Sequence, residues 1–291
     1  MNAVSLIAVP YELDRLRYGV GRGPEGLLET GVAEALGASG ATVETQVIEL
    51  TDDFSGETEA CFELIRRIQE RVDAAVGKGA FPVVLSGSCC LAALGVVAGL
   101  RQRAPGVVWF DAHPDFSTPE TATSGYFDGM GLAMLTGDAW QGMLSTVPGG
   151  RPVTETAVVL AGARDSEDDE TIRLGESGLK QLDAQELGSD HALARALKAL
   201  EPEPTGIYLH VDLDVLDAEE AQVNIYSAAG GITVEQLVSR VEQVLQTGMV
   251  KALSLTAYDP ECDREGRVPP VVDRLLRAAA LSAPALARGA T

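Results

Sequence analysis

The sequence has few basic residues and no long apolar run, and each shortage excludes a class of partner. Against 43 Asp and Glu residues there are 22 Lys and Arg residues, which gives a formal net charge of −21. This charge repels phosphate backbones and anionic lipids, so we expect neither nucleic acid nor a membrane surface as a partner. A small cationic substrate is compatible with it. No stretch approaches the ~18 apolar residues that a membrane-spanning helix needs.

Cysteine is also scarce, and its spacing does not indicate a disulfide-linked secreted domain. Cys89 and Cys90 are adjacent, whereas Cys61 and Cys262 lie far from them. The apolar stretch 4–10 has no basic segment before it and no small-residue cleavage pattern after it, so it does not resemble a signal peptide. We therefore expect a reduced, cytoplasmic protein.

What the sequence does contain is an alternation of short apolar runs and longer amphipathic stretches. The candidate strands are seven runs rich in β-branched residues, at 4–10, 42–50, 81–87, 106–113, 156–163, 206–216 and 250–259. Helical patterns lie between them, for example at 60–76 and 234–246. This alternation predicts an α/β fold in one domain, 1–291, with a mainly parallel sheet covered on both faces. The Ala-rich end after Ser282 is expected to fray.

Side chains that could bind metal follow three of the candidate strands. They are Cys89, the DAHPD segment at 111–115 and the DLD segment at 212–214. Because ligands bind beyond the carboxyl ends of parallel strands, we expect these three groups to meet at one edge of the sheet.

The spacing within the two acidic segments favours a metal site. Residues at i and i+2 share one face of an extended chain, so alternate side chains of each segment can project together. Four clustered carboxylates repel one another, and buried charge must be paired or must bind metal. Carboxylates suit Mn²⁺ and related ions, and a bridging carboxylate holds two ions close together. A lone DxD is more often a turn or a helix cap, but the pair of segments favours metal.

These segments resemble those of the arginase and agmatinase family of ureohydrolases, whose motifs read DAHxD and DxDxxDP. Further matches lie at 19–31, 161–170, 230–233 and 253–260, which read GVGRGPEGLLETG, AGARDSEDDE, GGIT and LSLTAYDP. The resemblance spans nearly the whole chain. It implies a three-layer α/β/α arginase-like fold and a hydrolase that cleaves a guanidino C–N bond with two Mn²⁺ ions. Members of the family commonly form trimers or hexamers, so a homo-oligomer is an expected assembly.

The resemblance also implies a set of metal ligands. By position they are Cys89, Asp111, His113, Asp115, Asp212 and Asp214. In the family pattern, the first and third aspartates of this list, Asp111 and Asp212, would bridge the two ions. Cys89 stands where the family has a histidine. A free cysteine is usually a small buried hydrophobe, but its place beside the acidic segments favours a ligand, while Cys90 is expected to be packing.

Two further departures from the family pattern concern the reaction. Asp128 replaces a catalytic-loop histidine that would move a proton near neutral pH, and it is the candidate catalytic residue at that position. Ala257 replaces the glutamate that pairs with a guanidinium group. Both changes predict a less basic substrate than arginine. The cysteine ligand and the missing histidine together resemble the hydroxyarginine hydrolases of D-cycloserine biosynthesis, which implies Nω-hydroxy-L-arginine as substrate and hydroxyurea and L-ornithine as products.

Contacts to the rest of the substrate are carried over by position. Ser117 and Ser124 would hold an α-carboxylate and Glu167 an α-amino group, although each has an alternative as an exposed loop residue. His210, which precedes the DLD segment, is interpreted as structural, and Asp217 as a turn residue.

Two alternatives to this function remain at the level of sequence. One is another guanidino-compound hydrolase, such as an arginase or an agmatinase-like enzyme. The other is a pseudoenzyme that keeps the fold and the metals but only binds. A substrate screen with metal-loaded protein would distinguish the three readings.

Overall fold

The computed structural model describes residues 3–102 and 104–282. Within them the chain forms an eight-stranded sheet with the order β4-β1-β5-β10-β9-β6-β7-β8, and all of its paired neighbours are parallel. The strands are β1 (Ala3–Val9), β4 (Thr42–Val47), β5 (Phe81–Ser86), β6 (Pro105–Phe110), β7 (Val158–Ala161), β8 (Lys180–Leu182), β9 (Gly206–Asp212) and β10 (Val250–Thr256). A separate antiparallel hairpin joins β2 (Tyr11–Glu12) to β3 (Arg15–Leu16).

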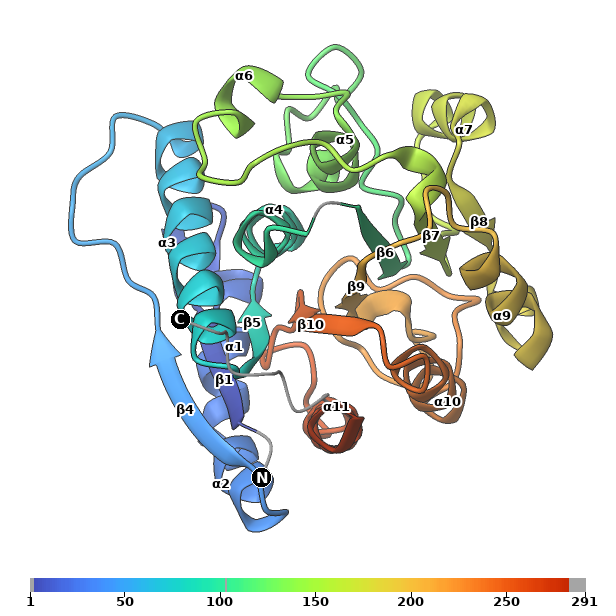
Figure 1. Ribbon diagram of the computed structural model, residues 1–291. Coiled ribbons are helices and arrows are strands. Elements are labelled where there is room, and N and C mark those ends of the chain that lie inside the picture. Colours follow the sequence, from blue (N-terminus) through green and yellow to red (C-terminus); the bar gives the residue numbers. More distant parts are fainter. Residues whose placement is uncertain (1–2, 103, 283–291) are drawn as a thin grey trace.

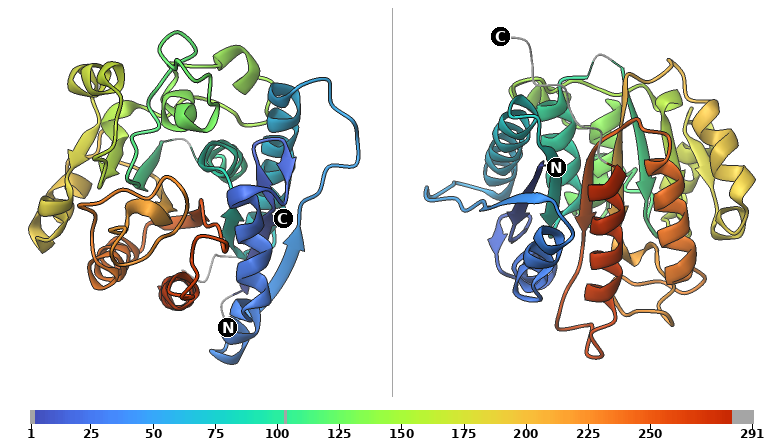
Figure 2. Two further views of the ribbon diagram at one scale, coloured as in Figure 1. Left: turned by 180° about the vertical axis from the view of Figure 1, so that it is seen from behind. Right: turned by 60° about the horizontal axis from the view of Figure 1, so that its bottom comes forward.

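Helices cover both faces of the sheet, which gives the predicted three layers (Figure 1). One apolar core packs beneath α1 (Gly23–Glu29), α2 (Val32–Ala38), α8 (Ala184–Leu187), α9 (Asp190–Lys198), α10 (Val234–Leu245) and α11 (Val268–Ser282). The other packs beneath α3 (Glu57–Gly77), α4 (Cys89–Leu100), α5 (Gly131–Thr136), α6 (Gln141–Leu144) and α7 (Asp168–Glu176). Short 3₁₀ turns are η1 (Gly19–Arg22), η2 (Asp128–Met130), η3 (Glu155–Ala157) and η4 (Leu213–Val215). Figure 2 shows α10 and α11 side by side in front of the strands.

The helix that begins at Cys89 is buried over its whole length. All twelve residues of α4 are buried, in agreement with a sequence that is apolar all round. Gly95 and Gly99 let it approach α3 closely, because a Cβ at these positions would lie 2.6 Å from Ile68 and 2.7 Å from Val72. This packing holds the start of α4, and with it Cys89, in a fixed place behind the sheet edge.

All seven strands predicted from the sequence are present, and the two predicted helices correspond to α3 and α10. Strand β8 was not predicted, since a three-residue edge strand is too short to show a periodic pattern. Each predicted strand extends beyond the observed carboxyl end, by one residue at β1 and β5 and by as many as four at β9. The Ala-rich end beyond Ser282 lies outside the described residues. No helix in the described part of the chain has the length and apolarity needed to cross a membrane.

Candidate metal centre

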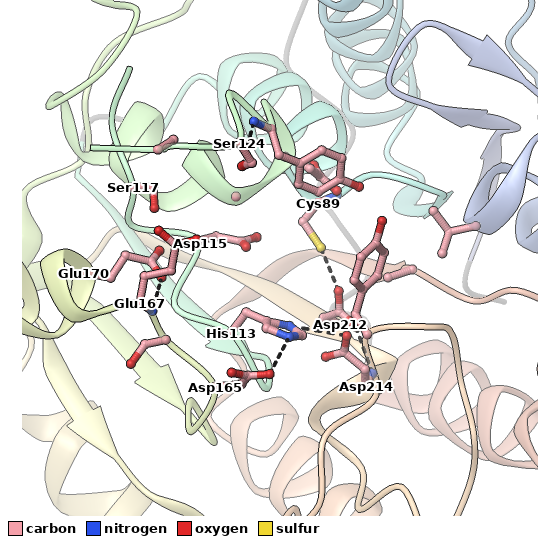
Figure 3. Close-up of a pocket in the computed structure, with 18 of the residues that line it drawn as sticks. Cys89, His113, Asp115, Ser117, Ser124, Asp165, Glu167, Glu170, Asp212 and Asp214 are labelled. Atoms are coloured by element: carbon pink, nitrogen blue, oxygen red, sulfur yellow. Dashed lines mark hydrogen bonds and ion pairs between the residues drawn. The ribbon is translucent and has the colours of Figure 1, made fainter. Parts of the chain in front are cut away.

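The three groups predicted to meet at the sheet edge do so. Cys89 opens α4 just after β5, Asp111 directly follows β6, and Asp212 is the last residue of β9. The thiol of Cys89 donates to Oδ2 of Asp212 at 2.9 Å. Figure 3 shows the side chains from these separate elements converging on one cavity.

Ligand atoms of three predicted residues come within metal-binding distance of one another, since those of Asp111, His113 and Asp214 all lie within 4.8 Å of each other. A second such group joins Cys89 and Asp111 to His210, which was interpreted from the sequence as structural. A mixed group of carboxylate oxygen, imidazole nitrogen and sulfur is compatible with a divalent transition ion.

The prediction from i and i+2 spacing assumed that the acidic segments continue the strands as extended chain. The segments form turns instead. Asp115 has a left-handed backbone with φ 48°, and Asp214 lies in the 3₁₀ turn η4. Turn-like hydrogen bonds order the carboxylates instead: Oδ1 of Asp111 accepts the His113 amide at 2.7 Å, and Oδ1 of Asp212 accepts the Asp214 amide at 2.8 Å. The side chains therefore converge through tight turns rather than through the pleat of a strand.

The cluster concentrates negative charge away from solvent. Asp111, Asp212 and Asp214 are 1%, 4% and 2% exposed. Burial, reinforced by Asp214 and Asp111, raises the pKa of Asp212 well above its usual range. Burial also raises the pKa of Asp115, with the charge of Asp111 adding to it. Carboxyl groups held in this way gain strongly from a bound cation, which supplies the missing counter-charge.

The pair of Asp111 and His113 shows the same demand for positive charge. Burial raises the pKa of Asp111 to about 6, opposed by its hydrogen bond with His113. Burial lowers the pKa of His113, but the hydrogen bond with Asp111 and the charge of Asp214 outweigh it and raise that pKa to about 9. In the protein without metal, a protonated His113 therefore takes the place of a cation.

A cavity of about 350 Å³ opens onto the cluster. Cys89, His113, Asp115, Asp212 and Asp214 line it, and so do the three residues predicted to contact substrate, Ser117, Ser124 and Glu167. In Figure 3, Ser117 and Glu167 lie at the left beside Glu170, and Ser124 lies at the top of the view. The hydroxyl of Ser124 accepts the Tyr126 amide at 3.2 Å.

Asp128 also lines the cavity, but both of its oxygens are engaged at the start of α4. Oδ2 accepts the amide of Cys89 at 3.1 Å and Oδ1 accepts the amide of Cys90 at 2.8 Å. Burial raises the pKa of Asp128, and the hydrogen bonds from Cys90 and Cys89 oppose this effect. The carboxylate thus anchors the helix that carries Cys89 by satisfying two of its otherwise unpaired amides. A part for Asp128 in proton transfer stays a prediction.

The two residues interpreted as structural are placed accordingly. His210 is fully buried, and its Nδ1 lies 2.8 Å from the hydroxyl of Tyr208. Asp217 accepts the amides of Glu219, Gly230 and Gly231 at 2.7–2.9 Å, as a turn residue does. Neither residue lines the cavity.

Several residues that support the cluster were not identified from the sequence. The indole of Trp109 donates to Oδ2 of Asp111 at 2.9 Å, and the buried amide of Asn224 donates to Oδ2 of Asp214 at 3.2 Å. Arg164 donates to six backbone carbonyls around η4 and the loop at 228–229. Trp109 lies two residues before Asp111 and therefore on the same face of the strand, so its contact with Asp111 could have been predicted. The sequence around the loop residue Asn224 has no such pattern.

Comparison with known proteins gives one consistent family. A model described as "Arginase family" matches residues 2–281. The arginase of Bacillus caldovelox is 28% identical over 292 residues, covering 95% of this chain and 97% of that protein. The crystal structure of arginase from Bacillus subtilis superimposes with a TM-score of 0.87 at 26% identity, covering 96% and 98% of the two chains. The formimidoylglutamase of Bacillus subtilis shares the fold, with a TM-score of 0.74 at 16% identity over 98% and 88% of the chains.

Proposed function

The chain belongs to the arginase family, and we propose that it is a single-domain, binuclear-metal hydrolase that cleaves the guanidino C–N bond of Nω-hydroxy-L-arginine. The products would be hydroxyurea and L-ornithine. One observation carries the proposal. A buried acidic cluster, in which the thiol of Cys89 contacts Asp212, lies at a cavity, and position 257 in the wall of this cavity is an alanine, which has no carboxylate.

The metal assignment follows the cluster. We assign two Mn²⁺ ions to Cys89, Asp111, His113, Asp115, Asp212 and Asp214, with Asp111 and Asp212 bridging. When bound, two such ions lower the pKa of water and polarise the group under attack. The raised pKa values of Asp115 and Asp212 support this assignment, because cations would offset the repulsion that causes them.

The preference for a hydroxylated substrate rests on what the cavity lacks. Ala257 has no charge to pair with a guanidinium group, and the oxygens of Asp128 are held by the amides of Cys89 and Cys90. The site therefore provides little help in binding or activating the strongly basic guanidinium of arginine. An N-hydroxyl group withdraws electrons and lowers that basicity, so the substrate itself provides part of the activation.

The other end of the substrate would lie against the opposite wall of the cavity. We assign Ser117 and Ser124 to the α-carboxylate and Glu167 to the α-amino group. All three line the same cavity as the metal-binding side chains, whose volume of about 350 Å³ suits an amino acid of this size. L-arginine is the second candidate, because relatives that match more than nine-tenths of this chain are arginases.

A comparison of three substrates tests the proposal. Mn²⁺-loaded protein is incubated with arginine, hydroxyarginine and agmatine, and urea and hydroxyurea are quantified. We expect kcat/KM for hydroxyarginine to exceed that for arginine by at least ~100-fold, or about 2.7 kcal/mol. Similar efficiencies on both substrates would refute the preference. Metal binding without turnover of any substrate would indicate a pseudoenzyme instead. Cys61→Ser is the matched control, a buried thiol in α3 that should leave the rates unchanged.

A further inference from the structure

A buried chain of polar side chains leads from the core of the sheet to the sulfur of Cys89. The hydroxyl of Tyr208 donates to Oγ of Ser254 at 2.9 Å and lies 2.8 Å from Nδ1 of His210. Nε2 of His210 lies 3.3 Å from Oγ1 of Thr256, and that hydroxyl lies 3.1 Å from Sγ of Cys89. All five residues are at most 2% exposed. The chain therefore has no access to solvent along its length.

Strand pairing fixes this arrangement. In the register of β9 and β10, His210 pairs with Ser254 and Thr256 pairs with Asp212, so the alternate residues share one face of the sheet. The ring of His210 stacks on Trp109 with centroids 3.8 Å apart and an angle of 18° between the planes. The imidazole is held by two strands and a stacked indole, so the direction of its nitrogens is set by the fold.

The hydrogen bonds determine which nitrogen of His210 carries a proton. Tyr208 uses its single proton on Ser254, so Nδ1 of His210 must be the donor to the Tyr208 oxygen. In a neutral ring that is fully buried and donates from Nδ1, Nε2 is then an acceptor toward the Thr256 hydroxyl. Thr256 then has one proton and three neighbours that can accept it, namely Nε2 of His210, the carbonyl of Val211 at 3.4 Å and a Cys89 thiolate.

We propose that Thr256 is a positioning residue for the Cys89 ligand. The hydroxyl of Thr256 donates to the sulfur of Cys89 when the thiol has lost its proton on metal binding. His210 competes for the same hydrogen and so limits the strength of that bond. A hydrogen bond to a ligand sulfur withdraws charge from it and tunes the metal. This inference rests on the proposed role of Cys89 as a metal ligand, but it is independent of the substrate.

Cobalt provides a direct readout of the sulfur. Full-length protein is stripped of metal with a chelator and titrated with Co²⁺, and the thiolate-to-cobalt charge-transfer band is recorded in the near ultraviolet. We expect Cys89→Ser to abolish the band. Thr256→Val removes the hydroxyl, leaves the sulfur richer in charge and should move the band to longer wavelength. Thr256→Ser keeps the hydroxyl and should restore the wild-type position.

His210→Phe gives a prediction of opposite sign. It keeps a ring to stack on Trp109 but removes the shorter of the two contacts that compete for the Thr256 hydrogen, the other being the Val211 carbonyl, so the bond to the sulfur should strengthen and the band should move to shorter wavelength. The matched control is Thr136→Val, whose hydroxyl bonds only to carbonyls within its own helix and should leave the band in place.

The outcomes separate the inference from its premise. If wild-type protein shows no band that Cys89→Ser removes, Cys89 is not a ligand and the inference fails with the metal assignment. If the band is present but does not move in Thr256→Val, only the inference is overturned. Should circular dichroism show that Thr256→Val does not fold, His210→Phe decides, and an unmoved band in that variant overturns the inference.

Discussion

Replacing Asp128 by alanine should destabilise the protein, because it removes the anchor of the helix that carries Cys89. The two carboxylate oxygens accept the amides of Cys89 and Cys90 in a buried environment. Each buried amide left without an acceptor costs about 1–3 kcal/mol, and the lost interaction with the positive end of α4 adds about 0.3–1 kcal/mol. The repulsion between Asp128 and the nearby Asp214 is relieved at the same time.

The net loss in the metal-loaded protein is therefore about 2–4 kcal/mol, or a fall in Tm of roughly 4–10 °C for a chain of this size. The loss should be smaller in the metal-free protein, where removal of one carboxylate relieves repulsion that cations would otherwise offset. Asp128→Asn keeps one acceptor oxygen and should show an intermediate effect.

Thermal unfolding of wild type and variants, with Mn²⁺ and with a chelator, measures both effects. Asp138→Ala is a matched control, because its carboxylate forms an exposed ion pair with Arg173 and should cost less than ~1 kcal/mol. An Asp128→Ala protein within ~0.5 kcal/mol of wild type in both forms would show that the two amide hydrogen bonds do not hold α4.

Four further outcomes are expected. Asp212→Ala should lose nearly all bound metal and hydrolysis, and wild-type metal content in this variant would remove the bridging assignment. In protein treated with a chelator, the raised pKa of His113 provides stability that is complete below pH 6.5 and is lost as the pH rises through about 9. The Tm should therefore fall across this pH range. An equally steep fall of Tm in His113→Asn would contradict this prediction. Arg164→Met should lower Tm and Mn²⁺ affinity together, because three carbonyls at η4 and three in the neighbouring loops lose their donor, and unchanged affinity on titration would refute the coupling. Cys89→His should raise arginine turnover, and an unchanged ratio of hydroxyarginine to arginine efficiency would assign the preference to Asp128 and Ala257 instead.

The fold was predictable because each long element shows its own period in the sequence. The buried parallel strands are continuous apolar runs, and α3 and α10 have amphipathic patterns. The strand order could not be derived from those patterns, since it depends on which apolar faces pack together. The hairpin of β2 and β3 and the edge strand β8 are too short to show a period.

The convergence of the candidate ligands at one edge of the sheet was predictable for a different reason. Asp111 and Asp212 follow apolar runs, and parallel topology brings strand ends together regardless of strand order. The contacts around them were not predictable. Thr256 contacts a cysteine 167 positions away, and Asp128 contacts two amides 38 and 39 positions away. Such contacts have no local signature, because they arise only when separate loops pack against the same helix.

The changes at positions 89 and 128 are physically linked under the proposed function. The start of a helix favours an anion through its free amides, and a thiolate at Cys89 would ordinarily profit from them. Here Asp128 accepts the amides of Cys89 and Cys90, so the sulfur has to be stabilised by bound metal and by Thr256. An aspartate held in this way is also less available to carry protons to solvent than a free imidazole would be. Because the Asp128 carboxylate anchors α4, the proposed reaction depends more on a substrate that provides part of its own activation.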